Sequence, residues 1–542
     1  MKVCEAIAHA LSDLGVDPLF GLIGDGNLFM VDHFVGTCGG RYVRATHEAN
    51  AVLMALGHAQ ISGGVGVATV THGPALTNTV TALVEGVKSA VPMVLLAGDT
   101  PAMDRGHPQK IDQKALVAVT GAGFEPLRSA GSVGEDLTRA YTRARIERRP
   151  IVFNMPIELQ WKETRDAPIK PPYTPQIITA PARGAELDQA VGIIASAHWP
   201  VVIAGRGAIA PATRAAILHF AERIEAPVAT TLRGKDLFRD EAYNLGFCGT
   251  LSTPVALDTL TKSDCLIVFG ASLNKYTASR GDLLKGKRVV QINPVATEIG
   301  RYFPVTAALV CDPGLAADAM VAVLDDAQIA GSGARTEDLR QALAQQHVPA
   351  HMSKPPRDNT VDFLEALDVV DRAFPQERVY VTDCGRFILG AWTRISVQRP
   401  QDFVHVMGFT AIGLGLGEAI GAALAGNGRP TLLVTGDGGF MLGGVNELVT
   451  AVREHLDLVI VVCNDGSYGA EYRQFTARDM DPKIALLEWP DFAPIAQAFG
   501  IAASTVRSTA DLQQAATAII KRDHTRPLLI DLRLDPDRML TL

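Results

Sequence analysis

Short apolar runs alternate with helix-like stretches along most of this chain. Each run is rich in Val, Ile, Leu and Ala, and turn residues or a proline stand near its ends. Continuous apolar strands between helices are typical of parallel sheets that are covered on both faces. The pattern therefore predicts an α/β fold with mostly parallel sheets. The predicted strands are 64–71, 92–97, 150–154, 200–204, 265–269, 288–292, 379–382, 431–435, 458–463 and 527–531.

Two proline-rich stretches, 167–175 and 354–357, interrupt this alternation, and the second follows a polar stretch at 331–346. A chain of 542 residues is too long for one hydrophobic core. Proline-rich segments are extended and solvated, so they make good domain boundaries. We expect three domains, at 1–170, 183–330 and 355–542. The first and third show a loosely similar α/β plan.

Composition narrows the class of protein. A net charge of −8 provides no basic surface for nucleic acid. The seven cysteines show no Cys-x-x-Cys spacing, which is typical of reduced, buried thiols in a cytoplasmic protein. The N-terminus lacks the layout of a signal peptide, and no apolar stretch reaches the ~20 residues needed to span a bilayer. We expect a cytoplasmic enzyme with a small-molecule substrate and with no nucleic-acid or membrane partner.

Candidate chemistry is concentrated near the C-terminus. The run 431–435 leads into Gly436-Asp437-Gly438, and the next apolar run ends at Asn464-Asp465. Turns from strand to helix present backbone N–H groups to an anion, and carboxylate oxygens suit Mg²⁺. A lone Gly-Asp-Gly turn is common. The order strand, turn, helix, strand and Asn-Asp favours a metal–diphosphate site over two plain turns.

This C-terminal segment, from 436 to 469, resembles the thiamine-diphosphate-binding motif of the superfamily that includes acetolactate synthase, pyruvate decarboxylase, benzoylformate decarboxylase and benzaldehyde lyase. The stretch 20–28 is similar to the family's N-terminal loop, with Ile23 in place of the usual proline. Thr46-His47-Glu48 resembles its His-Glu motif, and 71–78 resembles its glycine-rich turn. The resemblance covers essentially the full length. It implies three Rossmann-like layered domains, which are pyrimidine-binding, central and diphosphate-binding in that order.

The resemblance implies thiamine diphosphate as a cofactor and assigns residues to its two ends. Glu48 matches the glutamate that hydrogen-bonds the pyrimidine and favours the imino form that acts as the base. Ile412 matches the apolar side chain that bends the cofactor, and the carbonyl of Thr410 accepts from the pyrimidine amino group. The residues implied around the diphosphate end are Gly385, Arg386, Gly436, Gly438, Gly439 and Tyr468.

The resemblance also implies a Mg²⁺ site. Without gaps, the family motif places Asp437 as the first ligand, Asp465 as the second and the backbone carbonyl of Ser467 as the third. Asp465 stands where the family more commonly has Asn. A second carboxylate strengthens the binding of Mg²⁺ but repels the diphosphate.

Several substrate-side residues follow from the same resemblance. Asp25 and Glu471 fall where pyruvate and indolepyruvate decarboxylases carry catalytic acids. His72 lies in the turn that faces the cofactor, and His107 and Gln113 lie in a loop that approaches the substrate. Acids and imidazoles together can protonate the carbanion that decarboxylation leaves. The alternative for each residue is an ordinary loop or surface side chain.

The central segment carries Gly205 and Gly207 after one predicted strand and Gly270 after another. Relatives bind FAD or ADP in this domain. The glycines here do not complete a dinucleotide fingerprint, so a purely structural domain is favoured over one that binds FAD or ADP.

The implied activity is that of a Mg²⁺-dependent lyase that decarboxylates a 2-oxo acid. The resulting enamine is protonated or ligated to a second carbonyl compound, as in acetolactate synthase. One alternative is carbon–carbon cleavage of a hydroxyketone or diketone. An alternative of another class is a catalytically silent, cofactor-binding regulatory homologue. The family builds its active site from two chains, which implies a homodimer or homotetramer.

Overall fold

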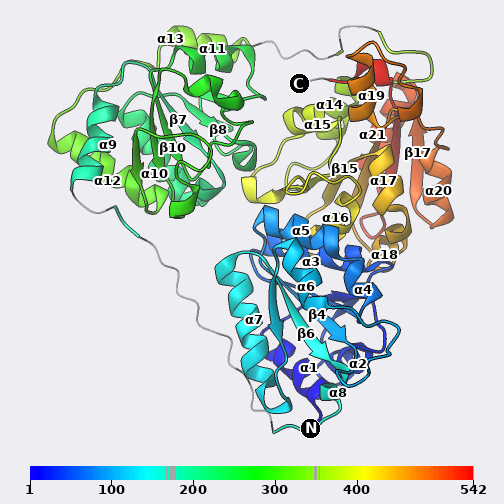
Figure 1. Cartoon of the computed structure of the whole chain (residues 1–542). Coiled ribbons are helices and arrows are strands. Elements are labelled where there is room, and N and C mark those ends of the chain that lie inside the picture. Colours follow the sequence, from blue (N-terminus) through cyan, green and yellow to red (C-terminus); the bar gives the residue numbers. More distant parts are fainter. Residues whose placement is uncertain (166–168, 170–178, 182–183, 347–350, 353–354, 541–542) are drawn as a thin grey trace. The chain divides into compact units, whose positions relative to one another are not determined.

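The computed structural model describes residues 1–165, 169, 179–181, 184–346, 351–352 and 355–540. These residues form three six-stranded sheets with helices packed against them (Figure 1). The strand pairings with a described register are all parallel, which confirms the predicted fold class. The chain divides into two compact units. One comprises 1–174, 350–395 and 404–541, and the other comprises 175–349 and 396–403.

The first sheet has the strand order β2-β1-β3-β4-β6-β5. Its inner strands are buried along nearly their whole length, which explains their continuous apolar sequences. The strands are β1 (Leu19–Gly21), β2 (Tyr42–Arg44), β3 (Gly66–Val70), β4 (Met93–Asp99), β5 (Gly123–Pro126) and β6 (Pro150–Pro156). The helices are α1 (Val3–Asp13), α2 (Leu28–Gly36), α3 (Glu48–Ser62), α4 (Pro74–Thr77), α5 (Val80–Ser89), α6 (Gln113–Thr120), α7 (Val133–Glu147) and α8 (Ile157–Gln160).

The third sheet has the order β14-β13-β15-β16-β18-β17, which repeats the order of the first sheet strand for strand. The similar plan expected for the first and third segments is therefore confirmed. The strands are β13 (Val379–Thr382), β14 (Phe403–His405), β15 (Thr431–Gly436), β16 (Leu458–Asn464), β17 (Ala502–Val506) and β18 (Leu528–Arg533). The helices are α14 (Phe363–Ala373), α15 (Ile388–Arg394), α16 (Gly415–Ala425), α17 (Asp437–Gly443), α18 (Leu448–Arg453), α19 (Gly469–Thr476), α20 (Phe492–Ala498) and α21 (Thr509–Ile520).

The central sheet, read from β9, has the order β9-β8-β7-β10-β11-β12, which is the doubly wound arrangement of a Rossmann domain. Its strands are β7 (Pro200–Ala204), β8 (Val228–Thr230), β9 (Asn244–Phe247), β10 (Cys265–Phe269), β11 (Arg288–Ile292) and β12 (Ala307–Leu309). Its helices are α9 (Ala185–Ala195), α10 (Pro211–Arg223), α11 (Pro254–Lys262), α12 (Pro313–Asp326) and α13 (Glu337–Ala344).

In a doubly wound domain, nucleotides bind where the strand order reverses, which here is between β7 and β10. At that point the Gly207 amide donates to the Gly270 carbonyl at 2.9 Å. A Cβ atom at Gly207 would lie 2.8 Å from the Gly270 Cα. The two turns are thus held against each other by their own backbones.

Each sheet falls inside one of the three predicted domains, since the strands span 19–156, 200–309 and 379–533. The predicted linker at 167–175, apart from residue 169, and residue 354 of the linker at 354–357 lie outside the described residues. The boundaries 1–170, 183–330 and 355–542 therefore stay predictions.

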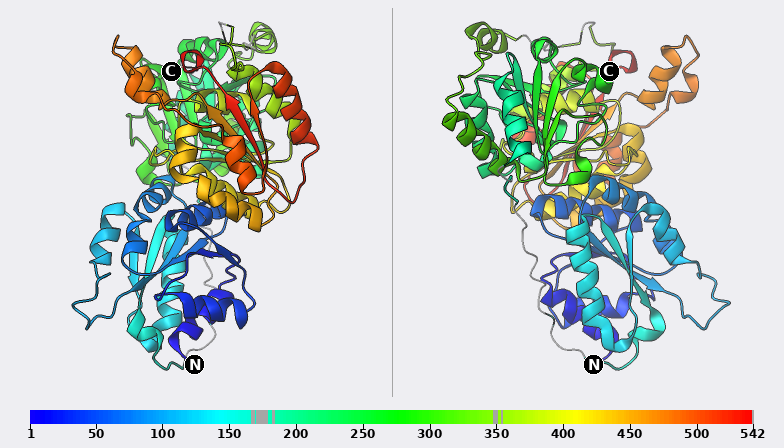
Figure 2. Two further views of the ribbon diagram at one scale, coloured as in Figure 1. Left: turned by 90° about the vertical axis from the view of Figure 1, so that its right-hand side faces the viewer. Right: turned by 60° about the vertical axis from the view of Figure 1, so that its left-hand side comes forward.

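Within the first unit, α3 and α16 pack backbone to backbone, and both views in Figure 2 show the blue and yellow segments that contain them in contact. A Cβ atom at Gly57 would lie 2.0 Å from the Glu418 carbonyl oxygen, and one at Gly421 would lie 1.8 Å from the Met54 carbonyl oxygen. One hydrophobic core continues from the first sheet through this helix pair into the third sheet. The junction therefore requires glycine at these positions.

The composition predicts reduced, buried cysteines and no helix that spans a membrane. All seven cysteines are free thiols, and all except Cys38 are buried, as expected. Within the described part of the chain, no helix is both long enough and apolar enough to cross a membrane.

Candidate active site

Two carboxylates meet at the carboxyl ends of neighbouring strands of the third sheet. β15 and β16 pair in parallel, so Asp437 after β15 and Asp465 after β16 lie at one edge. The Asp437 carboxylate accepts from the Gly438 amide at 2.7 Å and from the Gly466 amide at 2.8 Å. The Asp465 carboxylate accepts from the Ser467 amide at 3.0 Å and from the Ser467 hydroxyl at 2.7 Å. The two predicted metal ligands are thus brought together and held by their own turns.

The backbone carbonyl of Ser467 is the third predicted ligand. It takes no part in the backbone hydrogen bonds that join this turn to residues 485–487. Residues 466–468 pair with a second segment through the Gly466 carbonyl, which accepts from Leu487, and through the Tyr468 amide, which donates to Ala485. In such an antiparallel bridge the polar groups of the middle residue point to the opposite side. In the part of the chain that the structure describes, no three His, Cys, Asp or Glu side chains converge as metal ligands. The predicted site does not need three, because a carbonyl, phosphate oxygens and water complete the set.

Burial makes this carboxylate pair strongly acid-sensitive. Burial, reinforced by the Asp465 carboxylate, raises the pKa of Asp437 to about 7. Burial also raises the pKa of Asp465, although hydrogen bonds from Ser467 and the charge of Arg386 oppose the rise. Two buried carboxylates that repel each other are stabilised by a shared cation. The donor set therefore fits Mg²⁺.

Close packing surrounds the first turn of α17, which follows Asp437. A Cβ atom at Gly438 would lie 2.8 Å from the Tyr468 ring, and one at Gly439 would lie 2.8 Å from the Asp383 carboxylate. Asp383 is buried, and burial raises its pKa to about 6. The first amides of a helix have no partner within the helix, so this turn can bind an anion.

The other predicted diphosphate-side residues lie around the same turn. Gly436 is the N-cap residue of α17. Gly385 has a φ of +155° after β13, a conformation that favours glycine. Arg386 donates to the carbonyls of Pro536 at 2.8 Å and Met539 at 3.2 Å. Its Nε is buried and has no hydrogen-bond partner among the described residues, which leaves one N–H for an anion.

The predicted pyrimidine-contacting residues precede α16. Thr410 has a φ of +64°, a strained conformation for a β-branched residue. Ile412 is half-buried, and a Cβ atom at Gly439 would lie 3.6 Å from the Ile412 Cβ. Ile412 therefore stands beside the first turn of α17, next to the candidate diphosphate site.

Glu48 is the first residue of α3, and its carboxylate is half-buried. The Asn78 side chain donates to it at 2.9 Å. Asn78 follows α4, in the glycine-rich turn that the sequence singled out. Sequence reasoning missed the role of this residue, because nothing in the spacing between positions 48 and 78 indicates that they touch.

Asp25, His72 and His107 gather at the carboxyl edge of the first sheet. The His72 and His107 rings lie edge to face, with centroids 5.4 Å apart. Burial, reinforced by His107, lowers the pKa of His72, while the charge of nearby Asp25 opposes the effect. The Nδ1 of His72 is buried and has no partner in the described part of the chain. His72 is therefore a neutral imidazole with one nitrogen available, close to an exposed carboxylate.

Gln113 is buried and its amide is fully engaged. It accepts from the Gly73 amide at 2.9 Å and donates to the Gly98 carbonyl at 2.9 Å and to Asn154 at 2.6 Å. These contacts fix the turn that carries His72. They are the contacts of a positioning residue, whereas the sequence placed Gln113 on the substrate side.

Glu471 lies on α19, and its side chain is exposed. Among the described residues, no hydrogen bond or ion pair joins Asp25, His72 or Glu48 to Asp437, Asp465 or Glu471. The predicted catalytic and metal-binding residues of one chain thus fall into two half-sites. One lies at the carboxyl edge of the first sheet, and the other lies at that of the third.

Comparison with known proteins identifies the family. Residues 1–116 match the N-terminal TPP binding domain of thiamine pyrophosphate enzymes, 187–320 match the central domain, and 383–532 match the C-terminal TPP binding domain. The chain belongs to the thiamine-diphosphate-dependent enzymes. The two matched TPP binding domains contain the two half-sites described above.

Relatives of this thiamine-diphosphate enzyme are named for different reactions. It is 27% identical to the probable 2-ketoarginine decarboxylase AruI of Pseudomonas aeruginosa over 525 residues, which cover 94% of this chain and 90% of that protein. A probable acetolactate synthase large subunit of Methanocaldococcus jannaschii is 27% identical and covers 100% of this chain and 93% of its own. The acetolactate synthase isozyme 2 large subunit of Escherichia coli is 26% identical, with 99% and 96% covered.

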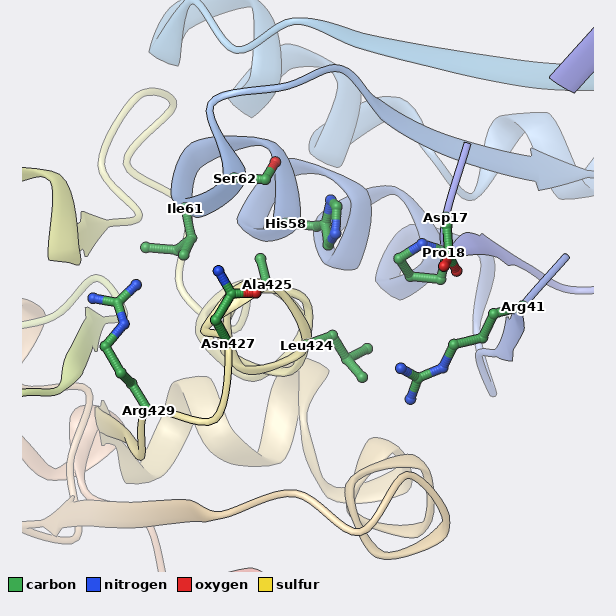
Figure 3. A pocket seen from close by; sticks show the side chains of 10 residues that line it. All are labelled: Asp17, Pro18, Arg41, His58, Ile61, Ser62, Leu424, Ala425, Asn427 and Arg429. Carbon is green, nitrogen blue, oxygen red and sulfur yellow. The ribbon is translucent and has the colours of Figure 1, made fainter. Parts of the chain in front are cut away.

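A polar cavity of about 370 Å³ lies elsewhere in this thiamine-diphosphate enzyme (Figure 3). Its lining includes His58 and Ser62 from the C-terminal half of α3, and Leu424 and Ala425 from the end of α16. Glu48 begins α3, and Thr410 and Ile412 precede α16, so these predicted site residues lie at the opposite, N-terminal ends of the two helices. The cavity contains none of them and is not the candidate active site. Its complete lining is Asp17, Pro18, Arg41, His58, Ile61, Ser62, Leu424, Ala425, Asn427 and Arg429.

Proposed function

We propose that this protein is a thiamine-diphosphate- and Mg²⁺-dependent lyase that decarboxylates a 2-oxo acid. The observation that carries the proposal is the meeting of Asp437 and Asp465 beside the first turn of α17. This arrangement offers hard oxygen ligands and helix-terminal amides side by side, which is what a metal–diphosphate group requires. The names of the relatives, a decarboxylase and acetolactate synthases, support the same reaction class.

Bound thiamine diphosphate supplies a nucleophilic carbon and an electron sink for the bond to CO₂. In the proposed site Asp437, Asp465 and the Ser467 carbonyl hold Mg²⁺. Glu48 holds a proton at the pyrimidine ring nitrogen, and Asn78 keeps its carboxylate in place. The Thr410 carbonyl orients the pyrimidine.

Further residues of the chain act on the substrate side. Ile412 would support the cofactor from the segment before α16. Asp25 and Glu471 deliver a proton to the carbon from which CO₂ leaves. His72, neutral because burial lowers its pKa, relays protons together with His107. Gln113 fixes the turn that carries His72.

Two versions of this proposal differ in what happens to the substrate fragment that remains after CO₂ has left. Protonation gives an aldehyde, for which Asp25 and Glu471 are suited. Attack on a second carbonyl compound gives a ligated product, as the names of the acetolactate synthase relatives suggest. We favour protonation as the first outcome to test, because two exposed acids and two imidazoles lie at the half-sites.

We further propose that the functional assembly is a homodimer or a dimer of dimers. Asp25 and Glu471 are exposed and Glu48 is only half-buried in a single chain, although a site for a reactive carbanion must exclude water. A second copy of the chain can cover both half-sites with its complementary half-sites.

The test is titration of purified protein with thiamine diphosphate in the presence and absence of Mg²⁺, by calorimetry and circular dichroism. Release of CO₂ is then measured from a panel of 2-oxo acids, with hydroxyketones and diketones added as candidates for carbon–carbon cleavage. We expect Mg²⁺-dependent binding and CO₂ release from at least one 2-oxo acid. Binding without turnover of any compound would instead identify a catalytically silent homologue.

A further inference from the structure

Two buried glutamates reach across the α3–α16 junction in opposite directions. Glu447, in the 3₁₀ turn η7 (Val445–Glu447), belongs to the third-sheet domain and is fully buried. Its carboxylate accepts from the Thr46 amide at 2.7 Å, the Thr46 hydroxyl at 2.6 Å and the His47 amide at 3.1 Å. Both backbone amides lie directly before Glu48.

Glu85, on α5 of the first-sheet domain, makes the reverse contact. It is 1% exposed. Its carboxylate accepts from the Gly408 amide at 2.8 Å and from the Phe409 amide at 2.7 Å. The Ser89 hydroxyl also donates to it at 2.7 Å. The Gly408 and Phe409 amides lie directly before Thr410.

The two contacts occupy corresponding places in two domains with the same strand order. Glu85 follows β3 and Glu447 follows β15, which is the third strand of its own domain. Each glutamate accepts hydrogen bonds from a segment of the other domain. That segment connects the second strand of its domain to α3 or to α16. These segments are 45–47 before α3 and 406–414 before α16. We call Glu85 and Glu447 the reciprocal glutamate clasps.

A carboxylate suits this task because hydrogen bonds to a charged acceptor are stronger than neutral ones. Glu85 accepts one amide on each of its two oxygens, whereas Glu447 accepts both amides on Oε1 and the Thr450 hydroxyl on Oε2. The clasp at Glu85 also explains how Thr410 retains a φ of +64°. The amides on its N-terminal side are held by the other domain, and strained backbone persists only where its surroundings fix it.

We propose that Glu85 and Glu447 are positioning residues that set the two ends of the pyrimidine site. Glu447 places Glu48, and Glu85 places the Thr410 carbonyl. This inference rests on the proposed function, because it assumes that Glu48 and Thr410 contact the cofactor. Neither glutamate touches the cofactor in this scheme.

The test uses three variants of the full chain, Glu85→Gln, Glu447→Gln and the control Glu418→Gln. Glu418 is also a buried carboxylate at the same junction, and it accepts at 2.7 Å from the side chain of Gln60, near the C-terminal end of α3. Glutamine removes the negative charge and replaces one acceptor oxygen with a donor, so the hydrogen bonds that each clasp accepts become weaker. Hydrogen exchange without cofactor should rise at 44–50 only in Glu447→Gln and at 406–412 only in Glu85→Gln.

With thiamine diphosphate and Mg²⁺, both clasp variants should bind the cofactor about tenfold more weakly and lose the circular-dichroism signal of the bound pyrimidine. Turnover should fall about 100-fold with little change in KM, since a misplaced catalytic group costs rate more than affinity for substrate. Glu418→Gln should retain cofactor affinity and signal. If the clasp variants lose thermal stability as the control does, but keep the wild-type affinity and signal, the clasps are merely structural and the inference is wrong. If wild-type protein binds no cofactor, the proposed function itself fails.

Discussion

The Asp437 carboxylate accepts a 2.8 Å hydrogen bond from the Gly466 amide, which ties the turn after β15 to the turn after β16. This bond orients the first predicted metal ligand toward the second one. Asp437→Ala removes both the ligand and the tie. We expect Mg²⁺-dependent affinity for thiamine diphosphate to fall by about 100-fold or more. Calorimetry with and without Mg²⁺ measures this directly, and unchanged affinity would remove Asp437 from the site.

Asp465→Asn is the matched control for that variant. Asparagine keeps the oxygen ligand and removes one of two buried negative charges beside the diphosphate, so we expect affinity to change by less than about tenfold.

The acid sensitivity of Asp383 gives a pH prediction for the metal-free protein. Burial raises its pKa to about 6. An acid whose pKa is higher in the folded state holds its proton more tightly there, so folding loses stability as pH rises from about 4 to about 6. The loss is at most about 3 kcal/mol for a shift of this size. Asp383→Asn removes this contribution.

We therefore expect the melting temperature of Asp383→Asn, relative to wild type, to rise between pH 4.5 and pH 7. Thermal unfolding of both proteins at the two pH values measures it. A difference that is the same at both would show that Asp383 does not titrate in this range.

The sequence anticipated the inner parts of the fold and missed the outer ones. All ten predicted strands are present, and each lies inside its sheet, where burial on both faces forces a continuous apolar run. The strands that were missed lie at or next to sheet edges. β17, for example, is mostly exposed or half-buried and contains Ser and Thr. Such an exposed strand lacks the apolar signal that a sequence can show, whereas β1 and β8 are buried but only three residues long.

The candidate site was predictable to the same degree. Asp437 and Asp465 each follow a predicted strand, so their meeting followed once those strands were neighbours. Glu85 and Glu447 were not recognised, because their partners are backbone amides more than 300 positions away. One signal was available, since each is a single carboxylate within an apolar stretch that the pattern buries.

The close approach of α3 and α16 at their glycines predicts how an alanine there would change the free energy of unfolding. A Cβ atom at Gly421 would lie 1.8 Å from the Met54 carbonyl oxygen, so the helices must separate in Gly421→Ala. We expect a loss of about 1–3 kcal/mol in the free energy of unfolding. Gly192, inside α9, has no atom near its Cβ position, so Gly192→Ala should gain about 0.5–1 kcal/mol from helix propensity. Chemical denaturation of both variants compares them, and equal effects would mean that α3 and α16 are not closely packed in solution.

Glu48 and Asp437 lie in different half-sites, which predicts the activity of dimers formed from two inactive variants. If Glu48 of one chain works with Asp437 of another, Glu48→Ala and Asp437→Ala are each inactive alone. A mixed dimer of the two variants contains one site that lacks both residues and one site that is complete. Random pairing makes half of the dimers mixed, so co-expression should restore about a quarter of wild-type CO₂ release. A different affinity tag on each variant, with sequential capture of a portion of the mixture on both tags, establishes that mixed dimers have formed, and sedimentation gives the oligomeric state of the wild type. Mixed dimers without activity, or a wild-type monomer with full activity, would show that each chain completes its own site.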